Sequence, residues 1–196
     1  MEAKSELRLA IRQRLARLPA RDREVESQIL VRELKKMLWE KPQTIALYSA
    51  YLDEPDLTEL ITEFLKQKNV ICLPKIERSH LEMHRILSLD DIHRNPVTNV
   101  PEPIDRSPLD ETSIDVVIVP GRAFTAKGER LGRGNGGYDH WIALQRIRNP
   151  ATQYIGVCFE CQIVQELPLE AHDERMDLVM TARKTHNTQG VLDTPR

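Results

Sequence analysis

Apolar residues recur with helical spacing in two stretches near the start of the chain, residues 4–18 and residues 22–39. The pattern predicts two amphipathic helices. The positions expected to face the core are Leu7, Ile11, Leu15 and Leu18 in the first helix and Val25, Ile29, Leu34, Met37 and Leu38 in the second.

From residue 44 onward the pattern changes to short apolar runs that alternate with amphipathic stretches. Buried strands are expected at residues 44–48, 69–74, 115–120, 154–159 and 177–181, and helices at 56–68, at 160–168 and from about Tyr138. Such alternation is typical of an α/β fold with a mostly parallel sheet. Residues 80–87 alternate with period two and are expected to add a strand at an edge.

The remaining segments carry few apolar residues. The proline-rich residues 95–108 are expected to form a surface loop, and the polar residues 185–196 a mobile C-terminal tail. The length of 196 residues favours a single domain, which we place at residues 1–184.

Composition narrows the classes of function. With 40% hydrophobic and 30% charged residues the chain is an ordinary globular protein, and its net charge of -2 argues against a nucleic-acid-binding surface. No apolar run approaches the roughly 18 residues of a membrane span. The arginine-rich N-terminus raises the possibility of a mitochondrial transit peptide, but its acidic residues, Glu2, Glu6, Asp22 and Glu24, favour a cytoplasmic protein. We expect a monomer.

The three cysteines are too few for a disulfide framework, which favours a reducing compartment. Cys158 and Cys161 form a CxxC pair, but Cys158 lies within an apolar run, so we interpret both as core thiols rather than as a zinc or redox site. The six histidines show no metal-ligand spacing and are interpreted as surface or loop residues.

Four of the eight glycines of the chain fall in the stretch "GRGNGG", residues 132–137. This stretch follows the strand that ends near Val119 and precedes a helix, and Arg130 and Arg133 flank its first glycine. Glycine-rich backbone at a helix N-terminus suits a phosphate group, and guanidinium groups match phosphate oxygens. A mobile hinge is the alternative.

Two named phosphate loops fit poorly. A Walker A loop requires Gly-Lys-Ser/Thr, which is missing. Gly132, Gly134 and Gly137 satisfy GxGxxG, with Glu160 as an acid downstream, but eleven residues, 121–131, separate this motif from its strand. A dinucleotide-dependent oxidoreductase is therefore only weakly supported.

A third candidate is specific. The segment "VPGRAFTAKGERLGRGNGGYDHW" closely resembles the signature of the 5-formyltetrahydrofolate cyclo-ligases, roughly VPGxxFDxxGxRLGxGxGYYDR. Further matching segments occur in the order of that family: "AKSELR", "LDEPDL", "CLPK", "NVPEP", "IGVCFECQ" and "LPLEAHDERMD". The resemblance implies a three-layer α/β/α sandwich that uses ATP and Mg²⁺ to convert 5-formyltetrahydrofolate into 5,10-methenyltetrahydrofolate.

The resemblance also implies roles for individual residues. Nucleotide contacts fall on Lys4, Arg8, Arg130, Gly132, Arg133, Gly134, Gly136 and Tyr138. Folate contacts fall on Glu54, Lys75, Arg133 and Gly136, and Mg²⁺ ligands on Asp139 and Asp173. Arg133 and Asp139 are the expected catalytic residues.

The chain departs from the family pattern at four positions. Gly137 replaces the first of two tyrosines, Asn135 a glycine or lysine, Thr125 an aspartate and His140 an arginine. The missing tyrosine would remove a surface that contacts folate. A non-catalytic relative that binds folate or nucleotide is therefore the main alternative to an active enzyme.

Overall fold

A computed structural model describes residues 2–39, 43–67, 69–77, 80–96, 99–104, 109–134 and 136–188. The helices are α1 (Glu2–Arg17), α2 (Ala20–Leu38), α3 (Thr58–Leu65) and α4 (Gly137–Arg148), with short 3₁₀ turns η1 (Leu89–Asp91), η2 (Glu111–Ser113) and η3 (Glu160–Gln162). None of the helices in these ranges is long and apolar enough to cross a membrane.

Within the described residues, seven strands form the central sheet in the order β11-β10-β9-β6-β1-β2-β3. Their bounds are β1 (Thr44–Ala46), β2 (Val70–Glu77), β3 (His80–Ile86), β6 (Val116–Val119), β9 (Gln153–Val157), β10 (Leu178–Met180) and β11 (Thr185–Asn187). The five inner strands are parallel, and β3 and β11 are antiparallel at the two edges. The α/β class and the edge position of residues 80–87 are confirmed.

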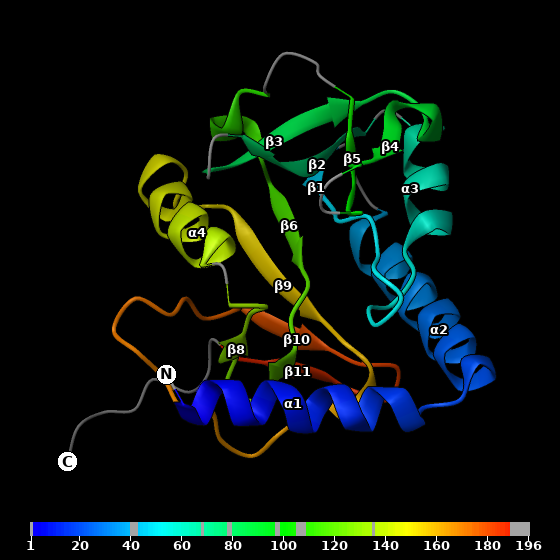
Figure 1. The fold of residues 1–196 in the computed structure, drawn as a ribbon. Coiled ribbons are helices and arrows are strands. Elements are labelled where there is room, and N and C mark those ends of the chain that lie inside the picture. The colour runs from blue at the N-terminus through cyan, green and yellow to red at the C-terminus, as the bar shows by residue number, and fades with distance from the viewer. Residues whose placement is uncertain are drawn as a thin grey trace.

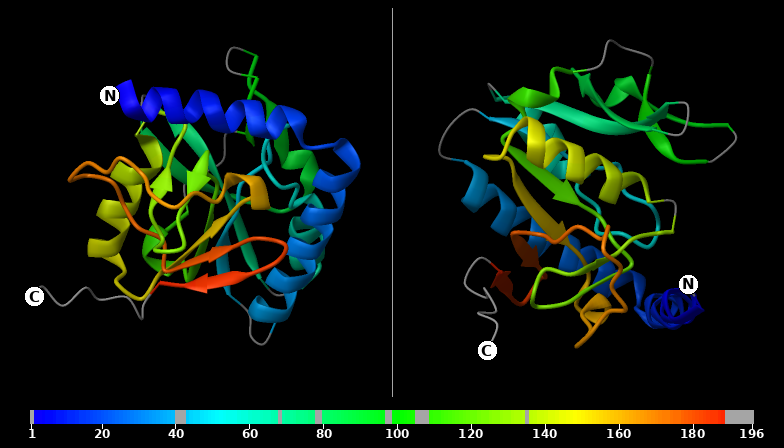
Figure 2. Two further views of the ribbon diagram at one scale, coloured as in Figure 1. Left: turned by 90° about the horizontal axis from the view of Figure 1, so that it is seen from below. Right: turned by 90° about the vertical axis from the view of Figure 1, so that its left-hand side faces the viewer.

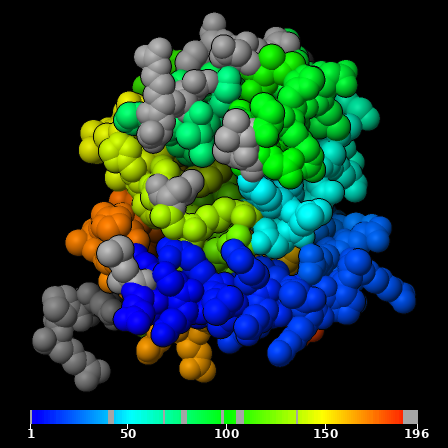
Figure 3. Space-filling view, in the orientation of Figure 1, coloured from blue at the N-terminus to red at the C-terminus, as the bar shows by residue number. Residues whose placement is uncertain are grey.

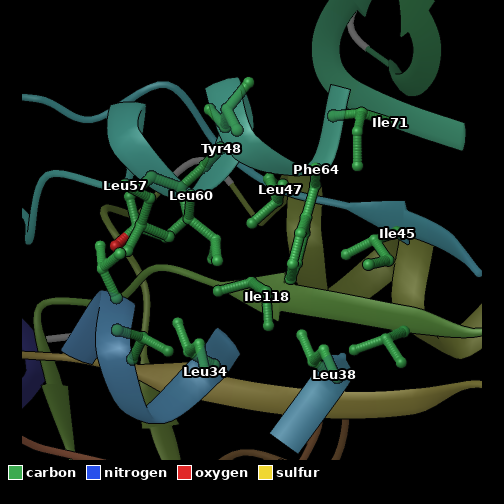
Figure 4. Packing of buried hydrophobic residues seen from close by; sticks show 14 of the residues in the cluster. Leu34, Leu38, Ile45, Leu47, Tyr48, Leu57, Leu60, Phe64, Ile71 and Ile118 are labelled. Carbon is green, nitrogen blue, oxygen red and sulfur yellow. The ribbon is translucent and has the colours of Figure 1, made fainter. Parts of the chain in front are cut away.

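Helices cover both faces of this sheet (Figure 1). On one face, α2 and α3 pack on β1 and β6 through a cluster that includes Leu34, Phe64 and Ile118 (Figure 4). On the other face, Trp141 and Ile142 of α4 pack on Val117 and Val119. The three-layer α/β/α sandwich is thus the observed architecture.

Helix α1 belongs to neither layer. It crosses the end of the molecule where β6 and β9 finish (Figures 1 and 2). Ile11 and Leu15 of α1 are fully buried there against Leu131 and Phe159. The predicted apolar stripe of α1 therefore packs on the loops at the carboxyl ends of the strands. Polar residues of α1 that border this stripe lie beside the same loops.

The smaller elements correct three predictions. Prolines 101 and 103 belong to β5 (Pro101–Pro103), which pairs with β4 (Ile92–Arg94) in a two-stranded ribbon, where a missing N–H is tolerated. The helix predicted at 160–168 is only the turn η3, because Gln162 donates to the carbonyls of residues 121 and 122 and Val164 pairs with Phe124. Residues 185–187 form β11, which pairs with β10, and 189–196 lie outside the described residues.

Three burial predictions also differ from the structure. Val25 is 45% exposed, and the buried positions of α2 are instead Ser27, Leu30, Val31, Leu34 and Leu38, because α3 packs on that neighbouring stripe. His84 is buried, since β3 places it on the same face as Ile86. Cys72 and Cys158 are buried free thiols, whereas Cys161 is only half-buried.

Candidate active site

The site lies where the crossover connections of the sheet change direction. Strand β1 continues through α3, which covers one face, and its neighbour β6 continues through α4, which covers the other. Loops that leave adjacent strands toward opposite faces open a crevice at the carboxyl end of the sheet. Residues 47–57 belong to the first of these loops, and residues 120–134 and 136 to the second. Figure 3 shows them beside α1 on one face of the molecule.

The glycine stretch is held in a conformation that side chains disfavour. Gly134 has φ +108°, and Gly136, the N-cap of α4, has φ +66°. A β-carbon is strained in this region of backbone space, so glycine at these two positions has a structural reason. Arg8 of α1 donates from Nε to the carbonyl of Gly132 at 2.9 Å and packs beside Gly134. The predicted phosphate loop is therefore fixed from outside by the N-terminal helix.

Two cavities adjoin this loop. The first, which we call the α1 cleft, has a volume of about 310 Å³. Its lining residues are Lys4, Ser5, Arg8, Arg130, Leu131, Gly132, Gly134, Gly136, Asp139, Glu170, His172 and Asp173. The cleft therefore brings together most of the residues predicted to contact nucleotide and both residues predicted to hold Mg²⁺.

The second cavity, the aromatic pocket, has a volume of about 160 Å³. It is lined by Tyr48, Tyr51 and Tyr138, by Glu54 and Arg133, and by the proline and glycine backbone of residues 120–121 and 136–137. The two cavities share four lining residues, Arg130, Gly132, Gly136 and Asp139. A larger cavity of about 490 Å³ between β3 and α4 contains none of these four, so size alone does not mark the site.

Each carboxylate of the α1 cleft is paired with a cation. Asp139 forms an ion pair with Arg130, whose Nη2 lies 2.8 Å from Oδ1 of the carboxylate. Asp173 accepts from Lys4 Nζ at 2.7 and 2.9 Å through its two oxygens, and Glu170 is 3.2 Å from the same nitrogen. Burial by itself would raise the pKa of Asp173, but the hydrogen bonds from Lys4 and from the backbone of Glu170 outweigh it, so that pKa is lowered.

In the aromatic pocket, the buried carboxylate of Glu54 forms an ion pair with the partly exposed guanidinium of Arg133. Both Nε and Nη2 of Arg133 donate to Oε1 of Glu54, at 3.1 and 2.7 Å, while Oε2 accepts from the backbone N–H of Tyr51. The guanidinium lies 4.0 Å from the centre of the Tyr51 ring. A carboxylate can accept about four hydrogen bonds, so Glu54 retains room for one donor from a ligand.

A second arginine reinforces the positive charge at this point. Arg122 pairs with Asp53, which also accepts from Arg133 at 2.8 Å. Burial, followed by repulsion from Arg133, Arg12 and Arg8, lowers the pKa of Arg122 to about 10. Two guanidinium groups, those of Arg122 and Arg133, therefore meet at the Asp53 carboxylate beside the predicted phosphate loop.

Tyr138 and Gly137, at the start of α4, line the aromatic pocket. Tyr138 lies 5.6 Å from the Arg130 guanidinium, and its buried hydroxyl has no hydrogen-bond partner among the described residues. Burial raises the pKa of Tyr138 above its usual range. A β-carbon added at Gly137 would meet no atom within 4 Å, so the missing tyrosine leaves open space.

The structure separates some residues that the sequence analysis grouped. Arg133 and Tyr138 line the aromatic pocket and not the α1 cleft. Lys75 lines neither; it lies in another groove with His93 and Arg94, because strand alternation turns it away from Pro74 and Ile76. Asn135 lies outside the described residues.

Sequence reasoning missed several residues of the site. Tyr51 and Asp53 lie just before Glu54 in the chain, and their proximity to a predicted folate contact was the available signal. Glu170 and His172 precede Asp173 and offer ligand atoms within 4.8 Å of one another and of its carboxylate. Nothing in the sequence marked Arg122, because its ion pair with Asp53 joins two loops that are far apart in the chain.

Comparisons with known proteins assign the chain to a family. The sequence profile of the 5-formyltetrahydrofolate cyclo-ligase family matches residues 1–182. The chain belongs to this family.

Relatives in the cyclo-ligase family cover nearly the whole chain. The mouse 5-formyltetrahydrofolate cyclo-ligase is 27% identical, over 91% of this chain and 93% of its own. The Escherichia coli K12 enzyme is 29% identical, over 89% and 97%. The structure of 5,10-methenyltetrahydrofolate synthetase from Aquifex aeolicus superimposes with a TM-score of 0.82 at 28% identity, over 98% of this chain and 96% of that one. The cyclo-ligase fold is thus present in full.

Proposed function

We propose that this protein is an active 5-formyltetrahydrofolate cyclo-ligase that converts ATP and 5-formyltetrahydrofolate into 5,10-methenyltetrahydrofolate, ADP and phosphate. The observation that carries the proposal is the wall shared by the two cavities. Arg130, Gly132, Gly136 and Asp139 line both. A nucleotide in one cavity and a folate in the other would meet at this wall, as transfer of a phosphoryl group between them requires.

The aromatic pocket is the proposed folate site. Tyrosine rings and prolines offer flat apolar surfaces for a pterin ring, and the Glu54 carboxylate can accept a hydrogen bond from a pterin N–H group. Arg133 holds Glu54 in position and presents its remaining N–H groups to the substrate. The lining residues come from the loops that follow β1 and β6, from the neighbouring strands and from the first turn of α4, so the pocket is assembled from segments that are far apart in the chain.

The α1 cleft is the proposed nucleotide site. Backbone N–H groups of Gly132, Gly134 and Gly136, just before α4, would bind phosphate oxygens, assisted by Lys4, Arg8 and Arg130. Asp139 and Asp173 are hard oxygen donors in this same cleft, so they fit a Mg²⁺ ion that takes few carboxylates and completes its shell with water and phosphate. When bound, Mg²⁺ supplies neutralisation of the phosphate charge.

The formyl carbon of the substrate is a poor electrophile, so the reaction requires its activation. We propose that the formyl oxygen of the substrate attacks the γ-phosphorus of ATP, releasing ADP and leaving the formyl carbon activated as a phosphate ester. N10 of the folate then attacks that carbon, the ring closes, phosphate leaves, and the N10 proton passes to solvent. The chain contributes positioning and charge: Arg130 at the shared wall stabilises the transferred phosphoryl group, and Asp139 orients Arg130.

The principal test is the absorbance of 5,10-methenyltetrahydrofolate on mixing the protein with ATP, Mg²⁺ and 5-formyltetrahydrofolate. Formation of the product with stoichiometric ADP supports the proposal. Binding of folate or nucleotide without product would establish the second candidate, a non-catalytic relative, which the open space at Gly137 favours. Omitting Mg²⁺ and replacing ATP with ADP are the controls.

We also propose that the protein acts as a monomer in the cytoplasm, with these small molecules and no nucleic acid or membrane as its partners. The free thiols of Cys72, Cys158 and Cys161 suit a reducing compartment. Both cavities are built from one chain. Light scattering would test the monomer, and fractionation of the source cells the compartment.

A further inference from the structure

Lys4 lies at the centre of a group of potential metal ligands. Its Nζ is 2.7 and 2.9 Å from the two oxygens of Asp173 and 3.2 Å from Glu170. Only 12% of the Lys4 side chain and 9% of the Asp173 side chain are exposed. An ammonium group that binds both carboxylate oxygens covers the face of the carboxylate that a metal ion would use.

The acidic side of this contact is suited to a divalent cation. Glu170, His172 and Asp173 each offer a ligand atom, and these atoms lie within 4.8 Å of one another. His172 Nε2 is also 3.3 Å from the Glu170 carboxylate. The two carboxylates suit Mn²⁺ as well as Mg²⁺. The ammonium of Lys4 and a metal ion therefore require the same oxygens.

The charges that line the α1 cleft decide whether Lys4 or a metal ion occupies these oxygens. Its lining holds equal numbers of basic and acidic side chains: Lys4, Arg8 and Arg130 against Asp139, Glu170 and Asp173. A metal ion that enters alone must break the Lys4 contact and leave that ammonium without its partners, which is unfavourable in a partly buried site. A triphosphate changes the balance, because its oxygens are new partners for Lys4.

We propose that Lys4 competes with the divalent cation for Asp173 and Glu170, and that nucleotide relieves the competition by drawing Lys4 onto its phosphate groups. Metal and nucleotide consequently bind with positive cooperativity, and the cation site is selective for the metal–nucleotide pair over free metal. This inference rests on the proposed nucleotide site. It adds that Lys4 is a positioning residue that controls metal affinity.

Metal binding without nucleotide gives the sharpest test, since it does not depend on turnover. Mn²⁺ alone is titrated into the full-length protein and followed by electron paramagnetic resonance. Lys4→Met removes the ammonium and keeps the length of the side chain, and it should bind Mn²⁺ at least about tenfold more tightly than the native protein. Lys4→Arg should remain as weak as the native protein. Lys36→Met, which removes a charge that pairs with Glu33 on α2, is the matched control and should also remain weak.

A second substitution locates the site. Adding Asp173→Asn to Lys4→Met should abolish the gain in Mn²⁺ affinity, and a nonhydrolysable ATP analogue should tighten Mn²⁺ binding in the native protein far more than in Lys4→Met. Far-UV circular dichroism checks folding, and Lys4→Gln replaces Lys4→Met if that variant does not fold. Equal Mn²⁺ affinity of the native protein and both neutral variants would overturn the inference, even if the cyclo-ligase assay succeeds. If Lys4→Met binds Mn²⁺ tightly but the native protein forms no methenyl product, the inference about Lys4 stands and the proposed activity is refuted.

Discussion

Arg133 and Glu54 come from loops that follow different strands, yet two nitrogens of the arginine donate to one oxygen of the carboxylate, at 3.1 and 2.7 Å. Arg133 was expected to contact both nucleotide and folate, and Glu54 folate. Their pairing places both side chains at the edge of the aromatic pocket, with Glu54 buried and Arg133 partly exposed. Arg133 thus fixes the position of the carboxylate that is proposed to contact folate.

Glu54→Gln should raise the KM for 5-formyltetrahydrofolate by about tenfold or more. The substitution keeps the shape but removes the charge, and a charge-assisted hydrogen bond contributes about 1.5 to 3 kcal/mol. The KM for ATP should change by less than about twofold, since Glu54 does not line the α1 cleft. Initial rates with each substrate varied in turn give both constants. Glu59→Gln, at an exposed position of α3, is the control.

Arg133→Ala and Arg8→Ala should affect different substrates. Arg133 lines the aromatic pocket and Arg8 the α1 cleft, so the first should mainly raise the folate KM and the second the ATP KM. The same kinetic measurements apply. If Arg133→Ala instead weakens ATP alone, the arginine turns to the phosphate groups when they bind, as the glycine motif first suggested.

Gly137→Tyr should lower the folate KM of an active enzyme or restore turnover to an inactive one. Nothing lies within 4 Å of the position where the new β-carbon would stand, and stacking of an aromatic ring on a pterin contributes on the order of 1 to 3 kcal/mol. The ratio of the folate KM values of the two proteins measures the gain. A higher KM would mean that another side chain already fills this space when folate binds.

Gly134→Ala should be harmful where Gly137→Ala is neutral. Gly134 has φ +108°, which costs an alanine about 1 to 2 kcal/mol, and its β-carbon would lie 3.4 Å from the Arg8 guanidinium carbon. Gly137 has neither constraint. Thermal unfolding should show a lower Tm for Gly134→Ala only, together with a higher ATP KM. Equal Tm values would indicate that the loop relaxes freely.

The Lys4–Asp173 pair should contribute to stability only over part of the pH range. The pKa of Asp173 is lowered in the folded protein, so its contribution is present above the unfolded value of about 3.9 and is lost as pH falls through the folded value. For Lys4, burial acts to lower the pKa, but the hydrogen bonds and charges of Asp173 and Glu170 outweigh it, so the pKa is raised. The contribution of Lys4 to stability is therefore fully present below its unfolded pKa of about 10.4 and is lost as pH rises through the higher folded value.

Comparing Tm of the native protein and Asp173→Asn from pH 3 to pH 8 tests this expectation. A pair contributing about 1 kcal/mol would separate the curves by about 2 to 4 °C above pH 5. The curves should converge below about pH 4. A constant difference across the range would show that Asp173 stabilises the fold through something other than its charge.

The sequence by itself determined the elements that depend on local periodicity. The stripe at Ile11 and Leu15, the apolar run of β6 and the alternation of β3 all predicted the observed burial or strand position, because side-chain direction repeats with the backbone. The family motif supplied residues that line both cavities. It could do so because the conformation of a glycine loop, including its positive φ angles, depends on a short stretch of chain. The α/β/α architecture followed from the same two sources.

The tertiary structure decided which of these residues meet. Arg133 pairs with a carboxylate 79 positions away, and Lys4 with one 169 positions away, and no local pattern encodes such contacts. The face of Lys75, the strand formed by residues 185–187 and the short η3 turn were likewise set by neighbouring segments. Long-range pairing depends on how strands are ordered in the sheet, and therefore the partners of the site's charged groups emerged only from the folded chain.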